Sequence, residues 1–176
     1  MIIIGFPCIG KSSVANEPIN GYTFSGFIDL ESSNFTKNDN WVSNYCNVAL
    51  DLSSQGYDVF VSSHAGVRDY LSRFQDKDDI IEVFPSFNMY DEWIRRLKNR
   101  YQNDSSDKNK RAYDYVSNNF FSSVEDMMHD NIQWKLILDK DSHISDLNRE
   151  IGNFCMENGL PEHERGGEKY GKMWLL

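Results

Sequence analysis

The sequence lacks any apolar run that approaches the roughly 20 residues of a membrane-spanning helix. Its apolar start, Met1-Ile-Ile-Ile-Gly5, is also too short for a secretory signal. Both absences predict a cytoplasmic protein with no membrane partner. Cysteine is scarce as well. Cys8, Cys46 and Cys155 are odd in number and have no metal-ligand spacing, so we expect free thiols in a reducing compartment.

Positive charge is also in short supply. The chain has 18 lysines and arginines against 27 aspartates and glutamates, which gives a formal net charge of -9. Broad binding to a nucleic-acid backbone requires many neutralising cations, so this balance argues against it. A local basic site is still compatible with the composition.

The 176 residues have the length of one domain, with no internal repeat and no recognisable linker. A domain of this size with 40% apolar residues can bury a core without disulfides or metal clips. We therefore expect a single domain over residues 1–176. The sequence leaves open whether it is a monomer or a homodimer.

Short apolar runs alternate along the chain with segments of helical periodicity. The expected strands are Ile2–Ile4, Tyr22–Leu30, Tyr57–Ser62, Ile80–Phe84 and Trp134–Leu138. Between them, apolar residues recur at helical spacing, and a closing helix is expected from Ile144 to Phe154. This alternation predicts an α/β fold of three layers, in which helices cover both faces of a five-stranded parallel sheet.

The segment Gly5-Phe-Pro-Cys-Ile-Gly-Lys-Ser12 follows the first expected strand and precedes a helix-compatible segment. It matches G-x-x-x-x-G-K-[ST], a phosphate-binding loop whose backbone N–H groups surround phosphate oxygens at a helix N-terminus. Lys11 supplies charge at the β- and γ-phosphates, and the Ser12 hydroxyl ligates Mg²⁺. We therefore expect a P-loop NTPase fold with ATP and Mg²⁺ as cofactors. The expected cofactor-binding residues are Gly5, Pro7, Cys8, Ile9, Gly10, Lys11, Ser12 and Ser13.

The same segment resembles the G-x-P-G-x-G-K loop of adenylate kinases and related nucleoside monophosphate kinases. Cys8 stands where those enzymes usually have glycine, so the loop must accommodate a side chain there. We expect an inert, packed thiol at Cys8. The alternative is a thiol whose position at a helix N-terminus lowers its pKa and makes it sensitive to oxidation.

Two later segments, Asp29-Leu-Glu31-Ser-Ser33 and Val61-Ser-Ser-His64-x-x-x-Arg68, resemble small phage-type and bacterial P-loop nucleotide kinases. The acidic pair is similar to the D-x-D of shikimate and gluconate kinases. That resemblance implies that Asp29 supports Mg²⁺ and that Glu31 contacts the acceptor; as an alternative, both acids only cap the loop. Ser63 and His64 follow the third expected strand, at the edge where substrates bind in open α/β sheets, so we expect acceptor contacts from them and from Arg68, one helical turn later. Ser32 and Ser33, beside Glu31, are further expected acceptor contacts. Helix capping by Ser63 or His64 and an exposed, unpaired Arg68 are the alternatives.

Basic residues are concentrated between Arg95 and Arg111, where seven of them accompany two acids. The segment Arg95-Arg-Leu-Lys98-Asn-Arg100 resembles the start of a nucleoside monophosphate kinase lid, and we assign 95–131 to a short helical lid with its adjoining helix. The polar stretch 102–110 is expected to be a mobile loop or a helix junction. Because phosphoryl transfer needs cations around the transferred group, one or two of Arg95, Arg96 and Arg100 should be catalytic. Lys98, Lys108 and Lys110 are expected to be ordinary surface charges.

Together these patterns predict a phosphotransferase. The leading hypothesis is an ATP- and Mg²⁺-dependent kinase whose nucleotide substrate is a nucleoside or deoxynucleoside monophosphate, with Lys11 and Asp29 in catalysis. One alternative is a kinase for a small hydroxyl metabolite or a polynucleotide 5′-hydroxyl, and another is a nucleotide-binding protein without catalysis. A guanine-nucleotide switch is disfavoured, because the sequence has no N-K-x-D motif and no D-x-x-G after the third strand.

Overall fold

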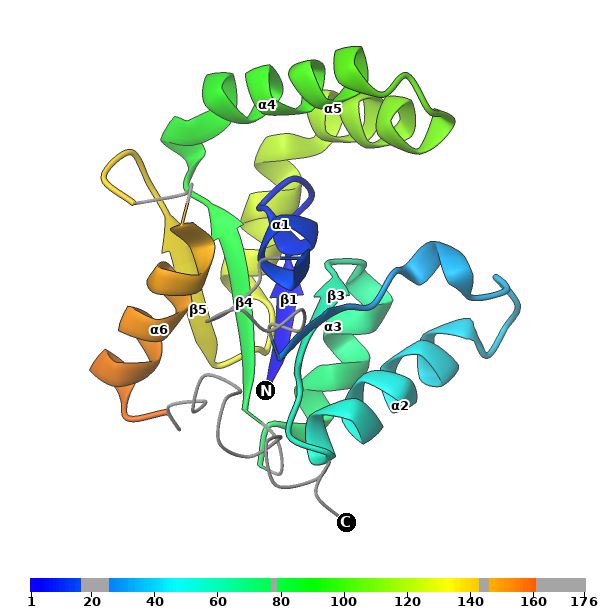
Figure 1. Ribbon diagram of the computed structural model, residues 1–176, viewed down its shortest axis with the longest axis vertical. Coiled ribbons are helices and arrows are strands. Elements are labelled where there is room, and N and C mark those ends of the chain that lie inside the picture. Colours follow the sequence, from blue (N-terminus) through cyan, green and yellow to red (C-terminus); the bar gives the residue numbers. More distant parts are fainter. Residues whose placement is uncertain (17–25, 77–78, 143–145, 161–176) are drawn as a thin grey trace.

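The computed structural model describes residues 1–16, 26–76, 79–142 and 146–160, and these form a five-stranded parallel sheet in the order β2-β3-β1-β4-β5. The strands are β1 Ile2–Gly5, β2 Phe27–Asp29, β3 Asp58–Ser62, β4 Ile80–Pro85 and β5 Trp134–Leu138. The parallel sheet and its alternation with helices confirm the predicted α/β class (Figure 1).

Strand β1 lies in the middle of the sheet, between β3 and β4. Its residues Ile2, Ile3 and Ile4 are fully buried, as expected of an all-apolar parallel strand covered on both faces. The loop that follows β1 therefore emerges between two neighbouring strands at the carboxyl edge of the sheet. In open α/β sheets this edge is where ligands bind.

Helices cover both faces of the sheet. The helices are α1 Lys11–Asn16, α2 Trp41–Ser54, α3 Ala65–Leu71, α4 Tyr90–Asn103, α5 Asp107–His129 and α6 Leu147–Asn158, with short 3-10 turns at η1 Ser32–Asn34, η2 Ser72–Phe74 and η3 Phe87–Met89. Helices α1 and α6 lie on one face, and α3 and α5 lie on the other (Figure 1). Their buried side chains join those of the strands in one hydrophobic cluster.

Helices α4 and α5 form a hairpin above the carboxyl edge of the sheet (Figure 1). Their junction is locally ordered: the Ser106 hydroxyl caps α5 by accepting from the Asn109 backbone N–H. The buried Asn109 amide also donates to the backbone carbonyl and the carboxylate of Asp104, at 2.9 and 2.8 Å. The polar stretch is therefore a helix junction, which is one of the two structures predicted for it.

Some expected boundaries differ from the structure. Strand β2 runs from Phe27 to Asp29, and residues 22–25 of the strand expected over Tyr22–Leu30 lie outside the described residues. The same holds for Ile144, so α6 is described from Leu147. The cap predicted at Ser63 is wrong, because His64 is the N-cap residue of α3. Among the described helices, none combines the length and the apolarity that crossing a bilayer would take.

Candidate functional site

The loop between β1 and α1 is anchored in the core by its own side chains, since Phe6 and Ile9 are almost completely buried. Both glycines of the motif have a structural reason. A Cβ on Gly5 would lie 2.6 Å from the Ile9 Cδ1 atom, and Gly10 has a φ of +102°, which side chains disfavour. Nothing lies within 4 Å of the place where a Gly10 Cβ would be, so the backbone is open to a ligand there.

Cys8 has a φ of +68°, in the left-handed region that glycine favours. It is the position at which the kinase loops that this segment resembles usually carry glycine, and its conformation is one that glycine favours. Burial raises the pKa of the Cys8 thiol, and the nearby charges of Arg100, Arg96 and Lys11 offset only part of that rise. This direction agrees with the inert, packed thiol expected for Cys8, and the alternative of a lowered pKa is wrong.

The Lys11 ammonium group lies against its own loop. Its Nζ donates to the backbone carbonyl of Gly5 at 3.0 Å and is 3.5 Å from that of Phe6. Burial lowers the pKa of Lys11, while the negative charges of Asp29 and Glu31 oppose that lowering. Lys11 thus brings a desolvated cation to the loop, with two carboxylates close enough to influence it.

Ser12 and Asp29 meet at the carboxyl edge of the sheet. The Ser12 hydroxyl donates to the Asp29 Oδ2 atom at 2.5 Å, which joins the start of α1 to the end of β2. A hydroxyl beside a carboxylate is a hard-oxygen donor pair of the kind that Mg²⁺ prefers. This pair therefore fits the predicted metal site, although no cluster of three or more metal-ligating side chains occurs in the described part of the chain. Ser13 is exposed, and its backbone N–H donates to the Gly10 carbonyl at the start of α1.

The three arginines of α4 differ in their surroundings. Arg95 is exposed and pairs with Glu92 at 2.7 Å, so the structure does not bring it to the loop. Arg96 also pairs with Glu92, but its guanidinium lies 5.3 Å from the Trp93 ring centre and its charge acts on Cys8. Arg100 lies close enough for its positive charge to lower the pKa of both the Cys8 thiol and Lys11. Arg100, followed by Arg96, is therefore the cation that α4 brings to the loop.

Glu31 follows β2 and forms an ion pair with the α4–α5 hairpin. Its Oε1 atom accepts from the Lys108 ammonium group at 2.6 Å, across 77 residues of sequence. Lys108 is therefore more than the ordinary surface charge that the sequence suggested, whereas Lys110 pairs within its own helix with Asp114. Ser32 and Ser33 form the turn η1 directly after Glu31, where the Ser32 carbonyl accepts from Lys37.

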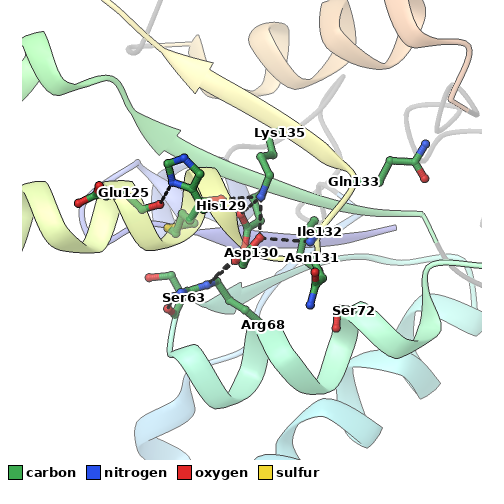
Figure 2. A network of polar contacts seen from close by, with 12 residues as sticks. Ser63, Arg68, Ser72, Glu125, His129, Asp130, Asn131, Ile132, Gln133 and Lys135 are labelled. Atoms are coloured by element: carbon green, nitrogen blue, oxygen red, sulfur yellow. Dashed lines mark hydrogen bonds and ion pairs between the residues drawn. The ribbon is translucent and has the colours of Figure 1, made fainter.

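Arg68 lies in a buried network of charges beneath the site. Its Nε donates to Asp130 at 2.7 Å and its Nη1 donates to the Ser63 backbone carbonyl, also at 2.7 Å. Figure 2 shows Asp130 between Arg68 and Lys135, which lies 2.6 Å from the Asp130 Oδ1 atom. The exposed, unpaired Arg68 considered from the sequence is wrong. Its partners give Arg68 a structural role and do not favour the acceptor contact predicted for it.

The fourth member of this network is Glu82, which is fully buried in β4 and lies 3.2 Å from Lys135 and 3.5 Å from Arg68. Burial raises the pKa of Glu82 to about 8, and the negative charge of nearby Asp130 adds to the rise. The sequence interpretation missed this network. Its only local signal was a single acid inside the apolar run Ile80–Pro85.

His64 and several aromatic rings flank the site on the side of α2. The Trp41 ring packs edge-on against His64 with centres 5.5 Å apart, and Lys37 lies 3.5 Å above Trp41. Burial lowers the pKa of His64, and the cations Lys37, Arg68 and Lys11 lower it further. The Tyr45 hydroxyl donates to the Leu30 carbonyl and accepts from the Ser62 N–H, so it fixes the ends of β2 and β3 together.

No family model matches the chain, and no curated protein matches it. Function must therefore be inferred from the residues of the site themselves.

Proposed function

We propose that this protein is an ATP- and Mg²⁺-dependent kinase that transfers the γ-phosphoryl group of ATP to a nucleoside or deoxynucleoside monophosphate. The observation that carries the proposal is the position of Lys11. Its half-buried ammonium group donates to the Gly5 carbonyl on the loop after the central strand, where the charges of Asp29 and Arg100 act on it and Ser12 is bonded to Asp29. Such a site combines a metal-binding side with a cationic side around one phosphate position.

The donor side rests on the loop and its two oxygen ligands. Backbone N–H groups from Gly10 to Ser12, at the start of α1, would bind the donor phosphates, and Lys11 would balance their charge. Ser12 and Asp29 would hold Mg²⁺, which neutralises charge on the β- and γ-phosphate oxygens when it is bound.

The acceptor side favours a phosphate nucleophile over a hydroxyl. An oxygen of a monophosphate is largely ionised at neutral pH, because its second pKa is about 6, so its attack on the γ-phosphorus needs no base. The bond to the bridging oxygen of ADP breaks as the new P–O bond forms. Glu31, the acid placed best to deprotonate a hydroxyl, is already paired with Lys108. Arg96 and Arg100 would offset the charge that spreads over the transferred group.

A coupled assay of ADP release tests the proposal across the common nucleoside and deoxynucleoside monophosphates. At least one acceptor should stimulate ADP release well above the background of the Lys11→Ala variant. If none does, the assignment to this substrate class is wrong. Binding of Mg·ATP without turnover on any acceptor would instead select the non-catalytic alternative.

Two arginines on the same helix provide a matched pair for the same assay. We expect Arg100→Gln to lower kcat by at least about tenfold, because Arg100 is the cation beside the loop. Arg95→Gln should stay within about twofold of the wild type, because Arg95 points to Glu92 and solvent. Equal effects of the two substitutions would contradict the placement of the catalytic cations.

A further inference from the structure

Trp93 makes a contact with the phosphate-binding loop that the proposed function does not use. Its side chain is fully buried on α4, and its Nε1–H donates to the backbone carbonyl of Pro7 at 2.7 Å. The two residues are 86 positions apart in the sequence. It is a direct side-chain hydrogen bond from the α4–α5 hairpin to the backbone of the loop.

This hydrogen bond fixes the orientation of one peptide group. The described residues contain no cis peptide bond, so the Pro7 carbonyl and the Cys8 N–H point in opposite directions. With the carbonyl held by Trp93, the Cys8 N–H faces away from α4. Cys8 is also the one described non-glycine residue with a positive φ, a conformation that persists only where the surroundings impose it. Successive N–H groups in such a turn form an anion-binding concavity.

The Trp93 ring is itself held firmly. It packs edge-on against Phe6 of the loop with ring centres 6.3 Å apart, and Phe6 packs in the same way against Phe120 of α5 at 5.8 Å. Arg96 lies over the other part of the ring, at 5.3 Å. The ring thus joins the loop to the helix that carries Arg96 and Arg100.

We propose that Trp93 is a positioning residue for the donor phosphates. Its indole N–H holds the Pro7–Cys8 peptide so that the Cys8 N–H is directed to the bound phosphates. Its ring, packed on Phe6 of the loop, keeps Arg96 and Arg100 of the same helix at a fixed position beside the loop. The proposal rests on the proposed function, because it assumes that the loop binds ATP. Trp93 does not touch the reacting atoms and acts through the loop backbone.

The test measures Mg·ATP binding by calorimetry in the wild type and in Trp93→Phe, which keeps an aromatic ring and removes the donor. We expect affinity to fall about 5- to 30-fold, because a buried carbonyl loses its partner. In the coupled assay, KM for ATP should rise by a similar factor, while KM for the acceptor changes less than twofold. Replacement of Trp93 by benzothienylalanine, which has nearly the same shape but no N–H, should give the same loss and covers the case in which Trp93→Phe does not fold.

The matched control is Phe120→Leu, which weakens the same aromatic cluster without touching the hydrogen bond. It should lower the free energy of unfolding about as much as Trp93→Phe, yet leave Mg·ATP affinity within about twofold. The proposal is overturned if the variants lacking the N–H bind Mg·ATP as the wild type does, or if Phe120→Leu weakens binding equally. In both cases the proposed function still stands. Wild-type protein that does not bind Mg·ATP at all would overturn both.

Discussion

At the scale of single residues, Cys8 has the backbone conformation of a glycine and the side chain of a packed thiol. A non-glycine residue in the left-handed region costs roughly 1–2 kcal/mol. Replacing Cys8 by glycine removes that cost but increases the entropy of the unfolded chain by about 0.4–1 kcal/mol. We therefore expect Cys8→Gly to be more stable than Cys8→Ala by about 0.5–1 kcal/mol in urea unfolding.

The comparison with Cys8→Ala isolates the backbone, because both variants lose the thiol and only alanine keeps the Cβ atom. The same pair of substitutions at Cys46, in the middle of α2, should have the opposite order, since glycine destabilises a helix by about 1 kcal/mol relative to alanine. A Cys8→Gly variant that is less stable than Cys8→Ala would show that the loop does not strain this residue.

The residues that the sequence could identify are those whose role depends on near neighbours. Gly5, Gly10 and Lys11 belong to one short loop, and its geometry accounts for both glycines. Lys108 and Trp93 depend on partners 77 and 86 residues away, so helical periodicity alone could show only which face of a helix they occupy. The sequence therefore located the loop after the central strand and its two glycines, but not the contacts that α4 and α5 make around it.

At the scale of elements, a network of ionisable side chains joins β4, β5, α3 and the end of α5, and its members are Glu82, Asp130, Lys135 and Arg68. The pKa of Glu82 is about 8 in the folded protein, above its ordinary value of 4.5. The folded state thus keeps a proton that the unfolded chain loses, so this group makes stability fall as pH rises from about 4.5 to about 8.

We expect Glu82→Gln to flatten this dependence, because glutamine resembles the protonated acid and does not titrate. Thermal unfolding between pH 6 and pH 8 should show a clear fall in the midpoint for the wild type and a smaller fall for Glu82→Gln. Glu125→Gln, the same chemical change at an exposed position of α5, is the control and should keep the wild-type slope. An unchanged slope in Glu82→Gln would mean that Glu82 is not the titrating group.

The contact between Lys108 and Glu31 joins the hairpin to the segment after β2. Both side chains are partly exposed, so we expect a coupling energy of only about 0.2–1 kcal/mol in a double-mutant cycle of Lys108→Met and Glu31→Gln. The coupling should shrink in 1 M salt, where the screening length falls to about 3 Å. A coupling of zero at low salt would show that the two elements are held together by other contacts.

At the scale of the whole molecule, ligand binding should stabilise the entire fold, because the loop is anchored in the central core by Phe6 and Ile9. At a Mg·ATP concentration 100 times the dissociation constant, the free energy of unfolding rises by about 2.7 kcal/mol. For a chain of this size that corresponds to a rise in melting temperature of roughly 5–10 °C. Lys11→Ala should show no such shift in calorimetry, and an equal shift in both proteins would place the nucleotide elsewhere.

The α/β class was predictable because it follows from local patterns, namely buried strands that alternate with helical segments. The position of the α4–α5 hairpin on the loop was less predictable from the sequence. Its sequence indicated two helices and a polar junction, but Phe6, Trp93 and Phe120 decide how the hairpin lies on the loop, and they are far apart in the chain. Tertiary packing of this kind has no signature in sequence periodicity.

Lys135 also affects the edge of the sheet. Strand β5 is the last strand in the order of the sheet, and its described residues pair with β4 alone. Such an edge can recruit a strand from another chain and so begin aggregation. Lys135 turns its ammonium group inward, to Glu82 and Asp130, and an inward-pointing charge on an edge strand disfavours recruitment. The ion network that joins the helices to the sheet therefore also helps to keep the protein from polymerising through its open edge.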